Sequence, residues 1–373
     1  MQIGETTVSS ISFMPTPHKH RIAQLQNLIR KQKLDSLLVT SPVNWYYLSG
    51  FTGDAGALLV EPRGLTLITD GRFTTQARQE APDVAVRPQK EGLWRTCGEL
   101  LKRRNRRKTG FDSEQMTVAQ LRALKKASGS GVRLVAVPGT VQRLRASKDP
   151  AELALMRKAA VLASEVVGAA VELLKPGVRE FEIAAEIEYQ MRKRGASGPA
   201  FETIVAFGAR AALPHARPTG KQLKKGQLVV LDLGAILDKY CSDITRTVFV
   251  GRAPRKVRAW YQAVLEAQAA AIDRVAAGQT GGEVDAAARG VLAAHRLDQY
   301  FVHSTGHGLG LEVHEDPRVA KGQKTLLASG NVVTIEPGVY LPGVGGIRIE
   351  DDVVVHRSGS EVLTRASRDF IEL

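Results

Sequence analysis

The sequence predicts a mixed α and β fold in two domains, and three observations support this. Its 373 residues exceed the roughly 100–200 residues typical of one domain. In residues 17–142, short apolar runs alternate with helical patterns, which indicates an α/β layer around a mostly buried sheet. Residues 143–373 follow the order helices, strands, helices, strands, which favours an α+β domain built from a duplicated half-unit. Residues 1–16 are expected to form an N-terminal tail.

The composition excludes several classes of protein. Apolar residues make up 43% and charged residues 24%, so the chain is neither disordered nor collagen-like. It has no run of about 20 apolar residues that could span a bilayer, and residues 1–16 lack the apolar core of a secretory signal. Two cysteines, Cys97 and Cys241, cannot build a disulfide framework. We therefore expect a cytoplasmic protein without a membrane partner.

The net charge of +14 is concentrated in the N-terminal part. Residues 1–147 hold 23 lysines and arginines against 11 acidic residues, and the excess peaks in the run KRRNRRK at 102–108. Such a run could bind polyanions. It also lies between an apolar helical pattern and a glycine, which favours a solvated helix end or loop. Nucleic acid is therefore not the expected partner.

Short periodic segments make up the N-terminal domain. Residues 21–33 place apolar side chains at helical spacing. Residues 36–40, 57–60 and 65–69 have the apolar, turn-bounded pattern of strands. Nothing in this half clusters His, Asp, Glu and Cys in a way that would hold a metal.

The second domain begins after a boundary near residues 138–150. Asp149 is an expected N-cap, with Pro150 in the first turn and Glu152 three residues after the cap. This helix should continue to Leu174. Further helices are expected over residues 180–194, 253–277 and 282–296, and strands over residues 227–233, 245–250, 331–335 and 346–355.

Two aspartates interrupt apolar strands of this domain. Asp232 lies within LVVLDLG, and Asp243 enters the next predicted strand eleven residues later. A hairpin would place the two carboxylates side by side, where they repel unless a cation holds them. An ion pair between one aspartate and Arg246 is the alternative.

Two glutamates repeat this pattern. Glu336 lies in VVTIEPG and Glu350 in GIRIEDD, where strand alternation would put Arg348 and Glu350 on one face. Four buried carboxylates would need equal numbers of cations, and the same strands offer only Arg246 and Arg348. Charge balance therefore favours a metal site.

A glycine-rich segment contributes histidines. FVHSTGHGLGLEVHE contains His303, His307 and His314. A lone histidine is more often a core residue, but three in twelve positions indicate a site. The spacing of His303 and His307 resembles a helical zinc pair, yet the internal glutamate is missing and Gly306 disfavours a helix.

One histidine with four carboxylates is an oxygen-rich, anionic set of ligands. Such ligands suit Mn²⁺, and Co²⁺ or Zn²⁺ could also bind. Five ligands exceed the need of one catalytic ion and fit two divalent ions about 3.5–4 Å apart that share a hydroxide, the nucleophile of a hydrolytic reaction.

The quoted stretches resemble the pita-bread metallopeptidases of the Xaa-Pro aminopeptidase (aminopeptidase P) and Xaa-Pro dipeptidase (prolidase) type. The resemblance extends over nearly the whole chain. It implies a creatinase-like N-terminal α/β domain and a catalytic domain with a duplicated, curved antiparallel sheet covered by helices. It also implies that the two aspartates chelate, that His307 and Glu336 each bind one ion, and that Glu350 bridges with Asp243.

The resemblance extends to residues around the ligands. It implies that three histidines hold the substrate and stabilise the tetrahedral intermediate: His215, His303 and His314. Glu336 would also shuttle a proton. Arg348 matches an arginine that braces the site, with Tyr240 as its suggested neighbour.

The implied substrate is a peptide with proline at its second position. We expect an Xaa-Pro aminopeptidase, with an Xaa-Pro dipeptidase restricted to dipeptides as the alternative. An alternative of another class is a non-catalytic pita-bread module that binds an acidic partner through its basic N-terminal surface. The resemblance further implies a homo-oligomer, either a dimer or a tetramer.

Overall fold

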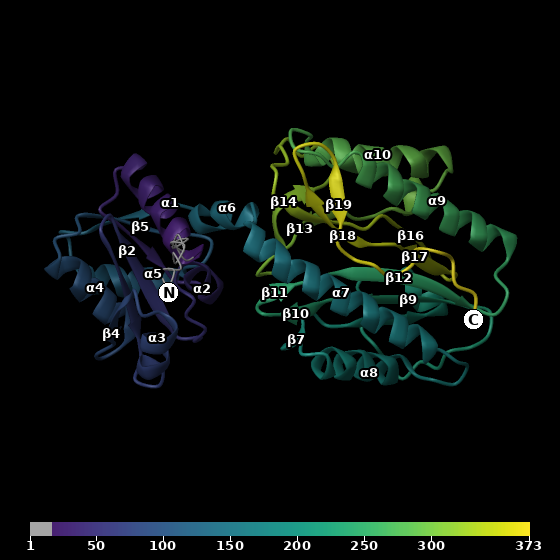
Figure 1. Ribbon diagram of the computed structural model, residues 1–373, viewed down its shortest axis with the longest axis horizontal. Helices are drawn as coiled ribbons and strands as arrows, with labels where there is room; N and C mark the ends of the chain where they lie inside the picture. Colours follow the sequence, from purple (N-terminus) through teal and green to yellow (C-terminus); the bar gives the residue numbers. More distant parts are fainter. Residues whose placement is uncertain (1–16) are drawn as a thin grey trace, which may run out of the picture. The chain divides into compact units, whose positions relative to one another are not determined.

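The structure is a computed structural model that describes residues 17–373 (Figure 1). The predicted tail of residues 1–16 lies outside the described residues. The chain divides into two compact units between Leu144 and Arg145, within the helix α6 (Thr140–Ala146). Each unit has β-sheets and a hydrophobic core of its own.

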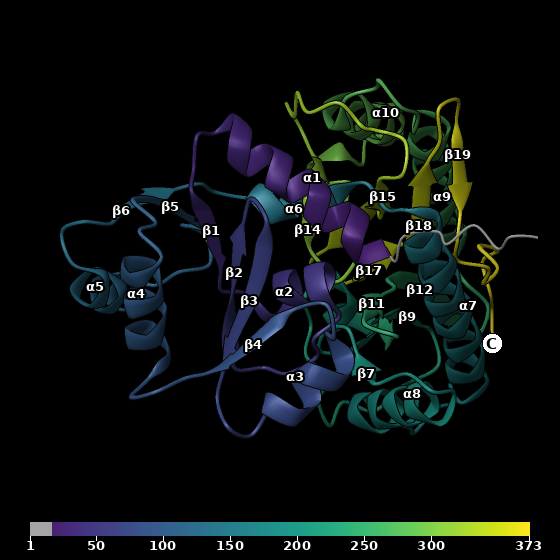
Figure 2. The ribbon, with the colours of Figure 1, turned by 60° about the vertical axis from the view of Figure 1, so that its left-hand side comes forward.

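The N-terminal unit is built on a six-stranded mixed sheet in the order β4-β3-β2-β1-β5-β6. Figure 2 shows α4 and α5 on one side of this sheet and α1, α2 and α3 on the other. The strands are β1 (Ser36–Val39), β2 (Gly56–Glu61), β3 (Gly64–Thr69), β4 (Ala85–Pro88), β5 (Lys108–Phe111) and β6 (Arg133–Ala136). The helices are α1 (Pro17–Lys31), α2 (Pro42–Ser49), α3 (Thr74–Glu80), α4 (Leu93–Arg103) and α5 (Val118–Ser128).

The C-terminal unit consists of two similar halves. The first half packs two helices on antiparallel strands: α7 (Pro150–Glu172), α8 (Glu180–Lys193), β7 (Gly198–Pro199), β8 (Ile204–Phe207), β9 (Gln227–Leu233), β10 (Ala235–Leu237), β11 (Tyr240–Cys241) and β12 (Ile244–Val250). The second repeats the arrangement: α9 (Arg255–Asp273), α10 (Gly281–Ala294), β13 (Gly306–Gly308), β14 (Glu315–Val319), β15 (Val332–Ile335), β16 (Gly338–Leu341), β17 (Gly345–Arg348), β18 (Asp351–Val355) and β19 (Ser360–Val362). Figure 1 shows the two helix pairs on opposite sides of the strands.

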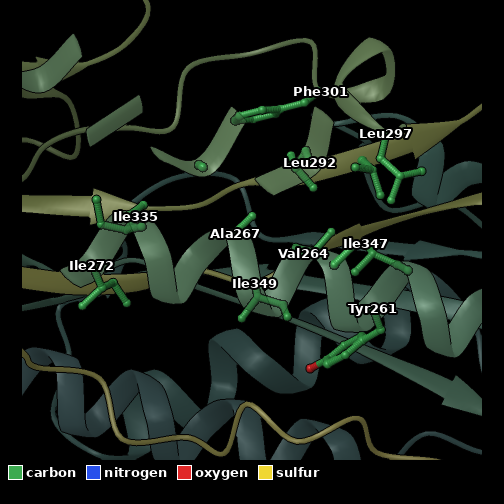
Figure 3. Packing of buried hydrophobic residues seen from close by; sticks show 14 of the residues in the cluster. Tyr261, Val264, Ala267, Ile272, Leu292, Leu297, Phe301, Ile335, Ile347 and Ile349 are labelled. Carbon is green, nitrogen blue, oxygen red and sulfur yellow. The ribbon is translucent and has the colours of Figure 1, made fainter. Parts of the chain in front are cut away.

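Each half has a core formed by the apolar stripes of its helices. Figure 3 shows the second core, where Val264 and Ala267 of α9 face Ile335 and Ile347. Val264, Ala267 and Ile335 are fully buried. Burial of a side chain as large as Val264 or Ile335 contributes roughly 1.5–3 kcal/mol. The two cores therefore hold each helix pair against the strands of its own half.

The start of α7 has the capping arrangement that the sequence predicts. The Asp149 carboxylate accepts hydrogen bonds from the backbone N–H groups of Ala151 and Glu152, and the Glu152 side chain accepts from the Asp149 N–H. Pro150 occupies the first turn, where no N–H is required.

We expect Asp149→Ala to lower the free energy of unfolding by about 1–2 kcal/mol, because two helix N–H groups lose their acceptor. Urea unfolding of the metal-free protein measures this. Asp149→Asn, which keeps one acceptor oxygen, should lose less than half as much. Equal losses for the two variants would contradict the capping explanation.

The predicted strand over residues 346–355 is wrong in one respect. It is two strands, β17 and β18, which pair with β16 and β15 in separate sheets. The ladder breaks because Pro337, between β15 and β16, has no N–H to donate. The ladder is also interrupted on the opposite strand, between β17 and β18. There the Glu350 N–H donates to the Thr245 carbonyl of β12. Two predicted ligands, Glu336 and Glu350, flank this break.

Within residues 17–373, no helix is both long and apolar enough to cross a membrane.

Candidate metal centre

The hairpin of β9 and β12 carries the two aspartates. The strands pair antiparallel with Thr245 opposite Asp232, and Asp243 directly precedes β12. Both aspartates are buried. The Asp243 N–H donates to an Asp352 carboxylate oxygen at 3.1 Å. The predicted hairpin is therefore confirmed.

The break at Pro337 directs both glutamates to the same place. The Glu336 N–H donates to the Thr305 carbonyl at 2.8 Å. One oxygen of Glu350 accepts the Thr245 hydroxyl at 2.5 Å. Since Thr245 lies opposite Asp232, this contact brings the second half of the domain against the hairpin of the first.

His307 lies on β13 with one ring nitrogen available. Its Nδ1 lies 3.0 Å from the Gly308 carbonyl, which can only accept, so Nδ1 must carry the proton. Its Nε2 lone pair faces Asp243 at 3.7 Å and Glu336 at 3.5 Å. Metal-binding histidines commonly have this arrangement. Gly306 allows it, because a Cβ there would lie 1.8 Å from the Thr334 carbonyl oxygen.

All five predicted ligands line one cavity of about 270 Å³. Ligand atoms of Asp243, His307 and Glu350 lie within 4.8 Å of one another. Asp232 and Glu336 complete the wall, together with Phe201, Glu202, Ile204, His215, Ala216, Arg217, Val313 and His314. Apolar side chains thus surround a small acidic centre.

Buried carboxylates outnumber the positively charged groups in this cavity. Burial, and then the neighbouring carboxylates Glu350 and Asp232, raise the pKa of Asp243 well above its usual value. Burial and neighbouring carboxylates raise the pKa of Glu350 well above normal and that of Glu336 to about 7. Burial lowers the pKa of His307 to about 4, so this histidine adds no positive charge near neutral pH. The site therefore favours added cations.

Arg348 supplies the positive charge that lies nearest to the carboxylates. It donates to Asp232 at 2.5 Å, to the Tyr340 hydroxyl at 2.6 Å and to the Thr245 hydroxyl at 3.1 Å. The ion pair that the sequence offered as an alternative, between Arg246 and one of the aspartates of the hairpin, is wrong, because Arg246 binds Asp351 at 2.7 Å.

Two buried oxygens point to bound cations. Oδ1 of Asp232 and Oδ1 of Asp243 have no hydrogen-bond donor among the described residues. A buried carboxylate oxygen without a donor is costly unless it binds a cation. Together with the neutral His307, these donors fit divalent metal ions.

The other predicted residues divide into two groups. His215 and His314 line the cavity, and the His314 ring lies 4.3 Å from that of His307. His303 is one step removed, because its Nε2 lies 2.8 Å from the Tyr340 hydroxyl. Tyr240, suggested beside Arg348, donates to Glu152 at 2.9 Å instead.

Tyr340 is the residue that sequence reasoning missed. It lies between His303 and Arg348, and so connects a predicted substrate histidine with the arginine that holds Asp232. Only the pairing of β16 with β17, with Gly338 opposite Arg348, brings it there. Its four-residue spacing from Glu336 was the available signal.

A buried ion cluster supports the glycine-rich segment. Arg145 and Lys148 bind the Glu315 carboxylate, which also accepts the Glu312 N–H at 3.0 Å. Arg145 additionally binds Glu312. The segment from His307 to His314 is thereby held at its far end.

Comparison with known proteins identifies the family. Residues 154–357 match the model of metallopeptidase family M24, and residues 21–147 match the creatinase/prolidase N-terminal domain. The chain belongs to metallopeptidase family M24. It is therefore an enzyme, and the non-catalytic module loses its support.

Relatives of this M24 metallopeptidase match over nearly its whole length. A Pyrococcus furiosus Xaa-Pro dipeptidase is 36% identical over 95% of this chain and 100% of its own. The structure of a Bacillus anthracis Xaa-Pro dipeptidase is 37% identical with a TM-score of 0.92, covering 95% and 100%. That of a Thermotoga maritima X-Pro aminopeptidase is 35% identical with a TM-score of 0.87, covering 94% and 100%. The creatinase-like domain and the pita-bread catalytic domain are thereby confirmed.

Proposed function

We propose that this M24 metallopeptidase hydrolyses the bond between an N-terminal residue and proline, with two divalent ions held by four carboxylates and one histidine of the cavity. The observation that carries the proposal is the convergence of all five side chains on one cavity, with two carboxylate oxygens lacking any donor among residues 17–373. The names of the relatives support the Xaa-Pro specificity.

The ions would be held by Asp232, Asp243, His307, Glu336 and Glu350. When bound, they would supply an activated water at neutral pH and polarise the scissile carbonyl. The oxygen-rich ligands favour Mn²⁺ over Co²⁺ or Zn²⁺.

The remaining steps belong to side chains of the chain itself. His215 and His314 line the cavity and can donate N–H groups to the oxyanion that develops on the substrate. The proline nitrogen carries no hydrogen and must gain a proton as the bond breaks. Glu336 lines the cavity and would transfer that proton. Arg348 would hold the Asp232 carboxylate in position. His303 would contribute indirectly, through its hydrogen bond to the Tyr340 hydroxyl.

The preferred substrate length is the finer part of the proposal. The sequence favoured an aminopeptidase, and the Thermotoga relative supports that specificity. The relatives from Pyrococcus and Bacillus support a dipeptidase. Arg217, an exposed arginine on the cavity wall, is 3.1 Å from Glu202 and could bind the free carboxylate of a dipeptide. We therefore favour Xaa-Pro dipeptides, with longer peptides as the second candidate.

Hydrolysis of Ala-Pro, Ala-Pro-Ala and Ala-Ala by Mn²⁺-loaded enzyme tests the proposal. Cleavage of Ala-Pro alone supports the dipeptidase, and comparable cleavage of the tripeptide supports the aminopeptidase. Cleavage of Ala-Ala at the same rate would overturn the proline specificity.

We expect Arg217→Gln to raise the KM for Ala-Pro by about tenfold, because a carboxylate loses its charged partner. The KM for Ala-Pro amide, which lacks the carboxylate, should stay within about twofold, and kcat should change little. Arg252→Gln, an exposed arginine outside the cavity, is the matched control. Equal effects of Arg217→Gln on acid and amide would contradict this role.

We also propose a cytoplasmic location, since Cys97 and Cys241 are both free and buried. A homo-oligomer, a dimer or a tetramer, is proposed from the family resemblance. Light scattering of the purified protein tests it.

A further inference from the structure

One edge of the N-terminal sheet collects most of the excess positive charge. β1, β5 and β6 are parallel neighbours, so their amino ends share an edge. α1, α4 and α5 end there too, because only four residues separate each helix from the strand that follows. The turn between β2 and β3 joins them, since β2 runs antiparallel to β1.

We define the basic pole as residues 31–35, 61–64, 102–108 and 125–133. Its acidic residues are only Asp35 and Glu61, which leaves a net charge of +10 out of +14 for the whole chain. Its twelve basic residues are Lys31, Lys33, Arg63, Lys102, Arg103, Arg104, Arg106, Arg107, Lys108, Lys125, Lys126 and Arg133. The charge run at 102–108 is thus half of a larger surface.

The two acidic side chains do not neutralise this pole. Buried Glu61 holds Arg104 and Arg106, which fixes both guanidinium groups in place. No carboxylate of residues 17–373 lies within 4.0 Å of the other ten cations. Ten of the twelve basic residues are exposed, and the other two, Arg106 and Lys108, are half-buried.

Helix dipoles explain only part of the charge. Lysines and arginines in the last turns of α1, α4 and α5 interact favourably with the helix carboxyl ends. Arg63, Arg107, Lys108 and Arg133 lie outside these turns, in a hairpin turn, a loop and two strand ends. Their presence at the same edge needs another reason.

We propose that the basic pole binds the phosphate backbone of double-stranded nucleic acid without regard to sequence. From β3 to β6 the edge spans four strand spacings, or roughly 19 Å. A duplex carries one charge per ~1.7 Å of axis, so about eleven phosphates face or flank such an edge. A hollow of about 310 Å³ between the ends of α4 and α5, lined by Lys102, Arg106 and Ser130, has room for a phosphate group.

The composition of the pole selects a duplex over other anionic partners. None of its four segments contains an aromatic residue, and single-stranded binding relies on aromatic stacking. Its segments also expose no large apolar side chain that would enter a membrane interface. Contacts from lysine and arginine side chains to the phosphate backbone, without contacts to the bases, are typical of sequence-independent duplex binding.

Fluorescence anisotropy with a labelled 20-base-pair DNA duplex, between 50 and 200 mM KCl, tests the proposal on the full chain. Binding should weaken with salt at a log–log slope of about −4 to −5, as about five phosphate contacts require. The triple variant Lys102→Glu, Arg103→Glu, Lys126→Glu should bind at least about tenfold more weakly and lower the slope by about 3.

The triple variant Lys224→Glu, Lys321→Glu, Lys324→Glu makes the same charge change on exposed lysines of the C-terminal unit. It should keep duplex binding within about threefold, and both triple variants should keep peptidase activity. An equal loss in the two triples would overturn the proposal, as would absence of duplex binding at 50 mM KCl. Tighter binding of single strands, or of vesicles containing anionic lipid, would overturn the choice of partner.

Discussion

Asp243→Asn should abolish most of the peptidase activity without destabilising the metal-free protein. Loss of a proposed metal ligand should cost several kcal/mol of transition-state stabilisation, or about 10²–10³-fold in kcat/KM or more. A carboxyl group whose folded-state pKa lies above the unfolded value weakens the fold at every pH above the unfolded value. Since burial and neighbouring carboxylates raise the pKa of Asp243, the neutral amide removes this penalty.

Thermal unfolding with and without Mn²⁺ measures this effect. Metal at 100 times its dissociation constant stabilises the wild type by about 2.7 kcal/mol, and the variant should lose most of that gain. Its metal-free Tm should equal or exceed that of the wild type. Asp351→Asn is the matched control, because it leaves Arg246 without its acidic partner and should lower the metal-free Tm. A lower metal-free Tm for Asp243→Asn would contradict the charge argument.

Arg348→Met should destabilise the metal-free protein by about 3–5 kcal/mol, as expected when one partner of a buried ion pair is removed. Its guanidinium is buried and holds Asp232, Tyr340 and Thr245. The variant leaves an uncompensated carboxylate beside three others. Mn²⁺ should restore part of the lost stability, because a divalent ion supplies the missing positive charge.

Urea unfolding with and without Mn²⁺ distinguishes this effect from simple loss of packing. Arg157→Met is the control, since its ion pair with Glu361 is well exposed and should contribute at most about 1 kcal/mol. A loss in Arg348→Met that is independent of Mn²⁺ would show that packing, rather than charge, explains the effect.

The candidate carboxylate ligands could be predicted from the sequence because each is a charged residue within an apolar strand segment. A carboxylate within LVVLDLG or VVTIEPG has no structural reason to be there, so charge balance alone indicates a cation. The start of α7 at Asp149 could be predicted for the same reason, since the capping arrangement depends on four consecutive residues. Local rules were sufficient in both cases.

Other features depend on strand pairing, which the sequence does not reveal. Tyr340 lies in an ordinary apolar strand, and only its register against Arg348 makes it part of the site. Pro337 is visible in the sequence, but the strand that pairs with its segment is not. The division of that strand into β17 and β18 could therefore not be predicted. The basic pole likewise depends on the sheet order, which brings four separate segments to one edge.

The two halves of the catalytic domain contribute unequal shares of the metal centre, and this fixes when metal can be captured. Asp232 and Asp243 come from the first half, whereas His307, Glu336 and Glu350 come from the second. A growing polypeptide therefore cannot assemble the proposed metal centre until the strands of both halves have been synthesised. Capture of metal by this site requires both halves, and their separation should release any bound ion.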